Sequence, residues 1–310
     1  MTTTMNRSTP TITSVFGSKG GTGKTSVIGN LSACLADMGQ RVLMIDADIQ
    51  QSLTNFFHID QLAEKGLVQL IQEQNPDGCI SRTDIEGLDI VVSNDFEKSL
   101  GHWIRFSSSR MQALRVALAR LPEGAYDYVM IDTQGADGTG DLQELVVNAS
   151  DRILLPVQPD ALVTREFATN SLQILDRYQP LDPDDTRHRV PRPHVLIYRY
   201  DRSRSHAVYL EGLRAMIAQL AADGRVIPVG TEIPHVVAYN AAQSGEEKKP
   251  VHRYDSRRRK DATLPCAYES MTALAHELFP ELVPLEPRVG DDAPFPVRPA
   301  PAGAREEVNA

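Results

Sequence analysis

A glycine-rich turn between a short apolar run and a helical pattern constrains this chain more than any other feature. Residues 18–25 read Ser-Lys-Gly-Gly-Thr-Gly-Lys-Thr. The run at residues 11–16 is typical of a short buried strand, and apolar residues recur at helical spacing over residues 25–38. Backbone N–H groups of such a turn point inward, and the following helix adds positive potential at its N-terminus. The sequence therefore predicts a strand, an anion-binding turn and a helix in succession.

The rest of the chain alternates apolar runs with helical patterns. The runs are short and uninterrupted, as in strands buried on both faces of a parallel sheet. They occur at residues 42–45, 88–92, 128–131, 152–157, 194–198 and 226–229, with helical patterns at 111–121, 167–178 and 208–220. This alternation predicts an α/β fold with a doubly wound, mostly parallel β-sheet and helices on both faces. Ligands of such sheets bind beyond the carboxyl ends of the strands, where the turn, Asp46, Asp48 and Asp132 all fall.

Composition fits a globular protein with one large core. The chain has 310 residues, of which 41% are apolar and 24% charged. Its apolar runs are far shorter than the roughly 20 residues that span a bilayer, and residues 1–10 lack the apolar segment of a secretory signal. We therefore expect a cytoplasmic protein that does not use a membrane. Cys34, Cys79 and Cys266 are widely separated, as expected of reduced and mostly buried thiols.

Three segments are expected along the chain. Residues 1–10 are polar and are expected to be a disordered N-terminus. Residues 11–281 are expected to form one nucleotide-binding α/β domain. Residues 282–310 combine repeated proline with alanine and charge, and they are expected to be a disordered tail.

The turn carries residues that bind phosphate and metal. Lys24 is placed to reach the outer phosphates, and the Thr25 hydroxyl is placed to hold Mg²⁺. The ordinary pattern G-x-x-x-x-G-K-[ST] is not strictly met, because Ser18 stands at its first position, and Lys19 adds a second lysine. The run Lys19 to Thr25 resembles the deviant Walker A motif of the ParA/MinD family of ATPases.

That resemblance implies ATP and Mg²⁺ as cofactors and an ATP-sandwiched homodimer. Lys19 would then reach across the dimer interface to the nucleotide of the partner. The residues implied to bind the nucleotide are Lys19, Gly20, Gly21, Thr22, Gly23, Lys24, Thr25 and Ser26.

Asp46 and Asp48 lie two positions apart at the end of an apolar run. Residues 45–50, Ile-Asp-Ala-Asp-Ile-Gln, resemble the switch I motif of the family, in which the second aspartate orients the attacking water. ATP hydrolysis needs a positioned water and charge stabilisation more than covalent chemistry. We therefore expect Asp48, Lys19 and Lys24 to be catalytic, although Ile49 stands where many relatives have proline.

Asp132 ends the apolar run Tyr-Val-Met-Ile-Asp-Thr at residues 128–133, which resembles a Walker B element. Thr25, Asp46 and Asp132 are thus the expected metal site. Gln134 replaces the proline that usually follows in the family. Two interpretations stay open for Gln134, a contact with the attacking water or a place in a plain surface loop.

Resemblance to the family extends over about residues 12–279. Residues 231–234, Thr-Glu-Ile-Pro, resemble the family stretch that lies beside the adenine, so Pro234 is an expected base contact. Asn240 stands where glutamate is common.

A basic run in the distal half suggests DNA binding. The net charge of −9 excludes a protein that coats nucleic acid with its whole surface, so any contact must be local. The expected DNA-binding residues are Arg253, Arg257, Arg258, Arg259 and Lys260, with Arg199, Arg202 and Arg204 as additions. The alternative is a solvated loop without a partner.

Together these patterns favour an ATPase of the ParA type, closest to ParA/Soj DNA-partition proteins. Such a protein binds DNA non-specifically as an ATP dimer, responds to a ParB-like or other stimulating partner, and associates with the nucleoid. One alternative is a conjugation-associated relative that recruits a DNA-transfer complex, and another is a MinD-like positioning regulator. A small-molecule kinase or ligase with a similar loop is a further alternative.

Overall fold

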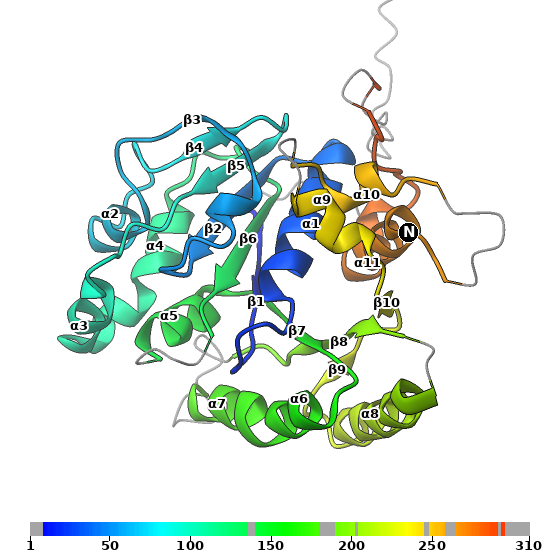
Figure 1. Cartoon of the computed structure of the whole chain (residues 1–310). Helices are drawn as coiled ribbons and strands as arrows, with labels where there is room; N and C mark the ends of the chain where they lie inside the picture. Colours follow the sequence, from blue (N-terminus) through cyan, green and yellow to red (C-terminus); the bar gives the residue numbers. More distant parts are fainter. Residues whose placement is uncertain are drawn as a thin grey trace, which may run out of the picture.

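A single twisted sheet forms the centre of the protein (Figure 1). The computed structural model describes residues 9–135, 140–179, 190–201, 204–244, 248–257, 264–290 and 293–294. The described strands are β1 (Thr11–Val15), β2 (Val42–Ala47), β3 (Ile59–Gln61), β4 (Ser81–Thr83), β5 (Leu88–Val91), β6 (Tyr128–Thr133), β7 (Arg152–Val157), β8 (His194–Tyr200), β9 (Ile227–Pro228) and β10 (Ile233–Pro234).

Strand order confirms the predicted doubly wound sheet. The order is β10-β8-β7-β1-β6-β2-β5-β4-β3, and β9 also pairs with β8. Pairing is parallel except where β4 meets β3 and β5. The first strand lies between β6 and β7, so the order in which strands are added to the sheet reverses beside β1, where the carboxyl ends of neighbouring strands leave room for a ligand.

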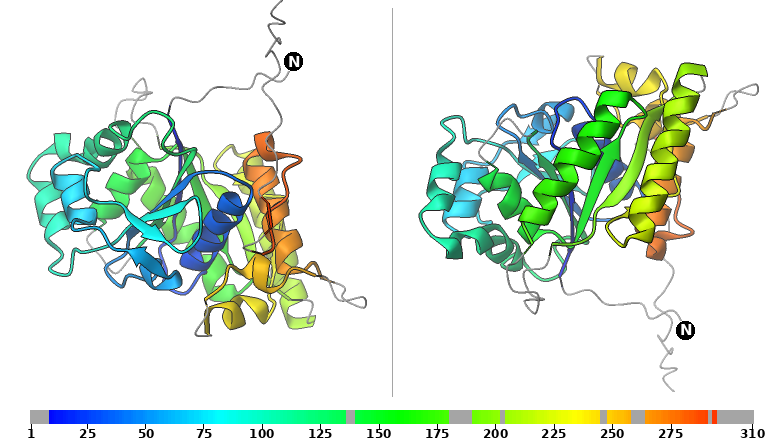
Figure 2. Two further views of the ribbon diagram at one scale, coloured as in Figure 1. Left: turned by 90° about the horizontal axis from the view of Figure 1, so that it is seen from above. Right: turned by 90° about the horizontal axis from the view of Figure 1, so that it is seen from below.

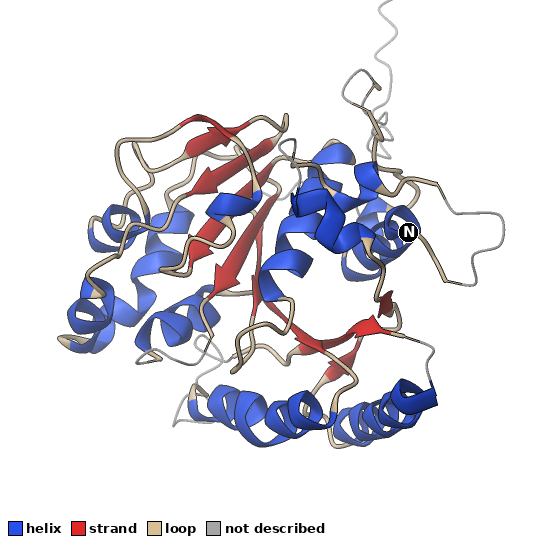
Figure 3. Ribbon diagram, in the orientation of Figure 1, coloured by secondary structure: helices blue, strands red, loops and turns tan. Residues whose placement is uncertain are grey.

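Helices cover both faces of the sheet (Figure 3). The described α-helices are α1 (Lys24–Asp37), α2 (Leu67–Gln72), α3 (Ser99–Arg105), α4 (Ala113–Ala119), α5 (Asp141–Ala149), α6 (Ala161–Glu166), α7 (Leu172–Arg177), α8 (Arg204–Ala222), α9 (Ala238–Ser244), α10 (Val251–Tyr254) and α11 (Ala267–Leu278). Helix α1 and helices α9 to α11 share one core cluster, whereas α2 to α5 pack on the opposite face. Seen from below, α8 and the α6–α7 segment run along β7 and β8 (Figure 2).

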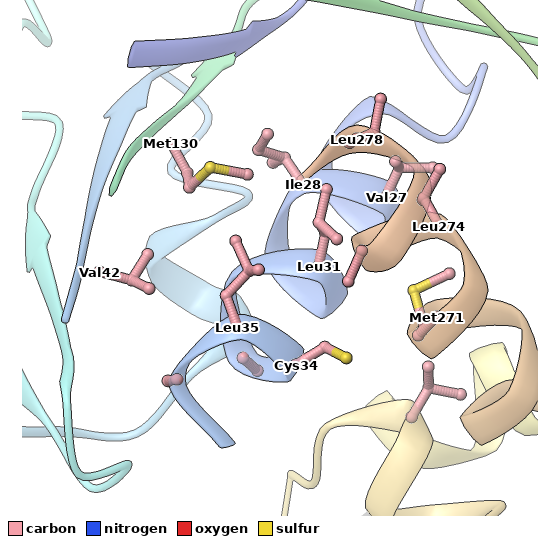
Figure 4. Packing of buried hydrophobic residues seen from close by; sticks show 14 of the residues in the cluster. Val27, Ile28, Leu31, Cys34, Leu35, Val42, Met130, Met271, Leu274 and Leu278 are labelled. Atoms are coloured by element: carbon pink, nitrogen blue, oxygen red, sulfur yellow. The ribbon is translucent and has the colours of Figure 1, made fainter. Parts of the chain in front are cut away.

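Helix α1 is buried nearly all round because it lies between the sheet and α11 (Figure 4). Leu35 faces Val42 and Met130 on the sheet side, while Met271 and Leu274 of α11 pack from the other side. Burying a leucine or methionine of this kind stabilises the fold by about 1.5–3 kcal/mol relative to exposure. The packing thereby fixes the helix that begins at the glycine-rich turn.

Most predicted elements are present, with shifted ends. Strands β2 and β6 continue through Asp46 and Asp132, so both carboxylates belong to the sheet. The predicted helix at 167–178 begins with a π-helical turn at Phe167–Ser171, which follows α6 directly and leads into α7. The 3-10 turns are η1 (Thr54–Phe56), η2 (Ser108–Gln112) and η4 (Pro280–Leu282).

The segment after α11 corrects the predicted start of the tail. Leu282, Leu285 and Arg288 are buried, so residues 282–290 pack onto the domain instead of forming a free tail. Arg288 donates from Nε to Asp37 Oδ1 at 2.9 Å, and its backbone N–H donates to the Asp37 carbonyl. Residues 295–310 lie outside the described part of the chain, as do residues 1–8 of the predicted N-terminus.

Asp37 accepts further hydrogen bonds at the C-terminal end of α1. Its carboxylate accepts hydrogen bonds from His252 Nε2 at 2.7 Å and from Arg253 Nε and a terminal nitrogen, both at 2.6 Å. Burial opposes ionisation, but the hydrogen bonds from His252 and Arg253 lower the Asp37 pKa to about 2. We call Asp37, His252, Arg253 and Arg288 the Asp37 cluster.

All three cysteines are free and buried, as predicted. Within the described ranges, no helix is both long enough and apolar enough to pass through a bilayer.

Candidate nucleotide and magnesium site

The glycine-rich turn ends in an uncapped helix. Gly23 takes a left-handed conformation with φ of 96°, and no side chain caps the first turn of α1. The first N–H groups of a helix have no intrahelical acceptor, so they are available to phosphate oxygens. Gly20 and Gly21 are exposed, and Gly21 also has a positive φ of 77°. The turn thus has an open backbone surface next to a helix N-terminus.

Lys24 and Lys19, predicted to bind nucleotide, lie together in this turn. Lys24 is 7% exposed, and its Nζ donates to the Lys19 carbonyl at 2.8 Å. The Lys19 residue is half-buried. One lysine is therefore held against the turn and the other lies partly at the surface.

Asp132 and Thr25 meet at the carboxyl end of β6. Asp132 pairs in register with Val15 of β1 and Asp46 of β2. The Thr25 hydroxyl donates to Asp132 Oδ2 at 2.6 Å, whereas the buried Oδ1 has no hydrogen-bond partner within the described residues. Burial and the neighbouring Asp46 raise the Asp132 pKa to about 8, despite the opposing effects of Thr25 and Lys24. A buried carboxylate with an unused oxygen is the chemistry that a cation satisfies.

Asp46 is turned toward the chain that follows β2. Its Oδ2 accepts from the Thr54 backbone N–H and hydroxyl, both at 2.7 Å, and its Oδ1 accepts from the Asp48 N–H at 3.1 Å. Burial raises its pKa to about 6. Asp46 therefore holds the loop between β2 and η1 in place while lying beside Asp132 on the next strand.

Asp48 lies just past the end of β2, in a turn instead of a strand. Its Oδ1 accepts from the Gln50 backbone N–H at 2.9 Å, and the residue is half-buried. Because Asp48 lies outside β2, the alternation of side chains along that strand does not determine where the Asp48 side chain points. The turn leaves the second carboxylate oxygen of Asp48 free of any bond that the structure records for it.

The loop after β6 closes against the glycine-rich turn. A Cβ on Gly135 would lie 3.2 Å from the backbone nitrogen of Gly20, so glycine permits this close approach. Gln134 is half-buried, and its carbonyl accepts from Gln143 Nε2 at 2.5 Å. Gln134 thus lies next to the site, while its role in hydrolysis stays a prediction.

Ser18 replaces the first glycine of the ordinary motif, and its hydroxyl makes contacts that a glycine cannot make. Its backbone N–H donates to Ser171 Oγ at 3.1 Å, the two hydroxyls lie 2.9 Å apart, and its own hydroxyl donates to Glu166 Oε1 at 3.4 Å. Ser171 belongs to the π-helical turn, a type of distortion that often marks functional sites. Sequence analysis missed Ser171 and Thr54, because no local pattern links them to residues so distant along the chain.

The site residues predicted in the distal half of the chain have different outcomes. Pro234 is buried in β10, which pairs with β8 at the edge of the sheet. Arg257 is exposed. Arg253 requires a correction, because its side chain is only 9% exposed and is paired with Asp37. A buried arginine that neutralises an internal carboxylate is not available to a DNA phosphate. Arg258, Arg259, Lys260 and Arg202 lie outside the described residues, and of the Arg204 side chain the structure describes nothing.

The fold, the uncapped helix behind a glycine-rich turn and the paired strand-end aspartates define a phosphate-loop nucleotide-binding protein. A family model described as an AAA domain matches residues 10–177. The chain belongs to this family of ParA/MinD-type ATPases.

Individual proteins agree with this assignment. The sporulation initiation inhibitor protein Soj of Bacillus subtilis is 32% identical over 175 residues, covering 55% of this chain and 68% of Soj. The chromosome partitioning protein ParA of Caulobacter vibrioides is 28% identical over 256 residues, covering 79% and 87% of the two chains. Among solved structures, the septum site-determining protein MinD of Pyrococcus horikoshii, complexed with Mg-ADP, has a TM-score of 0.61 at 21% identity. That match covers 87% of this chain and 96% of MinD and shows the shared fold.

The residues present fit ATP and Mg²⁺, the cofactors expected from the sequence. Thr25 and Asp132 offer a hydroxyl and an unpaired carboxylate oxygen, and Mg²⁺ prefers such oxygen ligands. When bound, the cation would neutralise charge on the β- and γ-phosphates.

Proposed function

We propose that this chain is a ParA-like ATPase that forms an ATP-sandwiched homodimer, binds DNA non-specifically and hydrolyses ATP to drive DNA partitioning on the nucleoid. The main support for this proposal is the glycine-rich turn with Lys19 and Lys24. The turn lies beside Asp132, a buried carboxylate whose pKa is raised. The partitioning role draws support from the likeness to a chromosome partitioning protein over most of both chains. A ParB-like partner that stimulates hydrolysis belongs to the same proposal.

The residues of the site have distinct proposed roles. Lys24 and the first N–H groups of α1 bind the outer phosphates. Asp132 and Thr25 hold the cation, and Asp46 keeps the loop that carries Asp48 in place. Asp48, which lies past the strand on a partly exposed turn, orients the attacking water.

Lys19 is suited to act across a dimer interface. The residue is half-buried, and the adjacent Gly20 and Gly21 are exposed, so the turn offers a surface to a second copy. Lys19→Ala should leave a monomer that binds ATP, whereas Lys24→Ala should lose ATP binding itself. Light scattering after gel filtration with ATP, together with fluorescent-nucleotide titration, measures both properties. A dimeric Lys19→Ala protein would contradict the assigned role.

Hydrolysis is the step assigned to Asp48. Asp48→Ala should lower the ATPase rate by about 100-fold, because the attacking water loses its acceptor, while nucleotide affinity is preserved. Steady-state phosphate release and nucleotide titration separate the two effects. Normal hydrolysis by Asp48→Ala would transfer the role to another residue, with Gln134 the next to test.

DNA contacts are proposed for the surface near α10. Arg257 is exposed there, and Lys248 and Lys249 lie exposed on the preceding segment. Arg253 no longer belongs to the proposed set. Arg258, Arg259 and Lys260 stay in it on sequence grounds alone.

The test is retention of non-specific duplex DNA with a slowly hydrolysed ATP analogue and with ADP. We expect retention with the analogue only, weakening steeply with salt because counterions are released. Arg257→Ala should weaken retention, and Arg82→Ala serves as the control, because Arg82 is an exposed arginine on β4. Retention that ignores the nucleotide would falsify the DNA role.

A further inference from the structure

Tyr198 of β8 lies directly against the glycine-rich turn. The residue is 1% exposed. A Cβ placed on Gly23 would lie 2.1 Å from Cε1 and 2.5 Å from Cδ1 of the Tyr198 ring, far inside contact distance. Gly23 is therefore required twice, by its left-handed backbone and by the ring that fills the space of its missing side chain.

The hydroxyl of the same ring contacts the start of α1. Tyr198 and Ser26 share a side-chain hydrogen bond, and Ser26 lies in the first turn of the helix. Burial raises the Tyr198 pKa, so the phenol stays protonated. Tyr198 thus touches both the last glycine of the turn and the uncapped first turn of α1.

Behind Tyr198 lies helix α9. The ring of Tyr239 meets the ring of Tyr198 edge-on, with centroids 6.1 Å apart and planes at 84°. The buried Tyr239 hydroxyl has no hydrogen-bond partner within the described residues. A buried unsatisfied hydroxyl is unfavourable, so this contact is held by the surrounding packing.

The residue after Tyr198 is strained. Arg199 has a φ of 60°, an uncommon conformation for a side chain of this size, and its buried Nε has no partner in the described part of the chain. Its terminal nitrogen donates to Asn240 Oδ1 at 2.9 Å. Neighbouring residues of β8 and α9 are thereby joined twice, through the tyrosine pair and through Arg199 with Asn240.

We propose that Tyr198 is a positioning residue that shapes the glycine-rich turn for nucleotide and passes a change in the turn to α9. The Tyr198 ring fills the space beside Gly23, so a shift of the turn at Gly23 toward β8 displaces this ring. Helix α9 continues the path toward α10, because the Lys249 N–H donates to the Ala242 carbonyl at 3.1 Å. The step from α9 to DNA rests on the proposed function, whereas the effect on nucleotide binding does not.

A double-mutant cycle tests the contact. Gly23→Ala should weaken Mg-ATP binding severely, because the new methyl group meets the ring. In a Tyr198→Ala background that clash is gone, so the further cost of Gly23→Ala should shrink by at least about threefold in Kd, a coupling typical of residues in contact. Equal costs of Gly23→Ala in both backgrounds would overturn the proposal.

Conservative variants separate positioning from general packing. Tyr198→Phe keeps the ring and removes the bond to Ser26, so Mg-ATP affinity should fall by about threefold with only a small decrease in melting temperature. Tyr200→Phe is the matched control, because Tyr200 is half-buried and packs with the cluster on the other face of the sheet. If the Tyr198→Phe protein binds ATP like the wild type, the Tyr198 hydroxyl has no role in positioning the turn.

The relay to α9 has its own measurement. With saturating ATP analogue, Tyr239→Ala should retain nucleotide but lose the difference in DNA retention between analogue and ADP. An unchanged difference would overturn the relay alone. If the wild type itself shows no such difference, the proposed function fails, and the nucleotide cycle still decides the role of Tyr198.

Discussion

Helix α1 connects two buried carboxylates with opposite surroundings. At its beginning, Asp132 has an oxygen without a hydrogen-bond partner among the described residues, and its pKa is raised to about 8. At its end, Asp37 accepts bonds from His252, Arg253 and Arg288, and its pKa is lowered to about 2. Both carboxylates are fully buried. The difference separates a carboxylate that is satisfied within the protein from one that keeps an oxygen for the proposed cation.

The largest expected effect is the loss of stability when Asp37, at the end of α1, is substituted. Asp37→Ala removes the buried carboxylate that Arg253 and Arg288 share, which costs about 3–5 kcal/mol of unfolding free energy. Urea unfolding followed by circular dichroism measures this loss. A variant with wild-type stability would show that the Asp37 cluster is not a structural centre.

Substitution of Asp132, at the beginning of α1, should affect ligand binding more than stability. Burial raises the Asp132 pKa to about 8, so the group is mostly protonated at neutral pH, and the neutral, similarly shaped Asn of Asp132→Asn should leave the nucleotide-free protein about as stable as the wild type. Magnesium-dependent ATP affinity should nevertheless fall by up to about 100-fold, because the cation loses an oxygen partner. Thermal melts without nucleotide and titration of ATP at varied Mg²⁺ measure the two responses. A strongly destabilised variant with normal magnesium dependence would reverse the comparison.

The smallest expected effect is on pH dependence. The folded-state pKa of Asp37, about 2, lies below its ordinary value of 3.8, so its contribution is present above pH 4 and is lost as pH falls toward 2. The contribution is about 2 kcal/mol, at 1.36 kcal/mol for each pKa unit. Arg288→Gln should make this acid limb shallower in unfolding measurements from pH 5 to pH 2. An identical limb in both proteins would contradict the role given to Arg288.

Asp132 acts with the opposite sign. Its folded-state pKa is raised, so the folded protein keeps a proton that the unfolded chain has lost, and stability from this group falls as pH rises through about 8.

The beginning of α1 was far easier to predict than its end. The turn, Asp46 and Asp132 follow one another in motifs whose strands and helix can be recognised locally. Asp37 and Arg288 are separated by 251 positions, and each looks like an ordinary charged residue in its own surroundings. Arg253 was assigned to DNA because it begins a basic run, and only the tertiary fold shows that it turns inward.

Other parts of the fold escaped prediction for related reasons. Strands β3 and β4 are only three residues long and are partly exposed, so they lack an apolar run. Tyr198 was predicted to lie in a strand, but nothing in its neighbours indicates that its ring fills the space beside Gly23. The close approach of Gly135 to Gly20 likewise joins segments that no local pattern relates.

The hydrogen bond from Lys24 to the Lys19 carbonyl ties the ammonium to the backbone of the turn. An ammonium carries three N–H donors, so this bond does not prevent a further contact with an anion. The positive charge is thereby held in place before a ligand arrives, and less side-chain freedom is lost when the ligand binds.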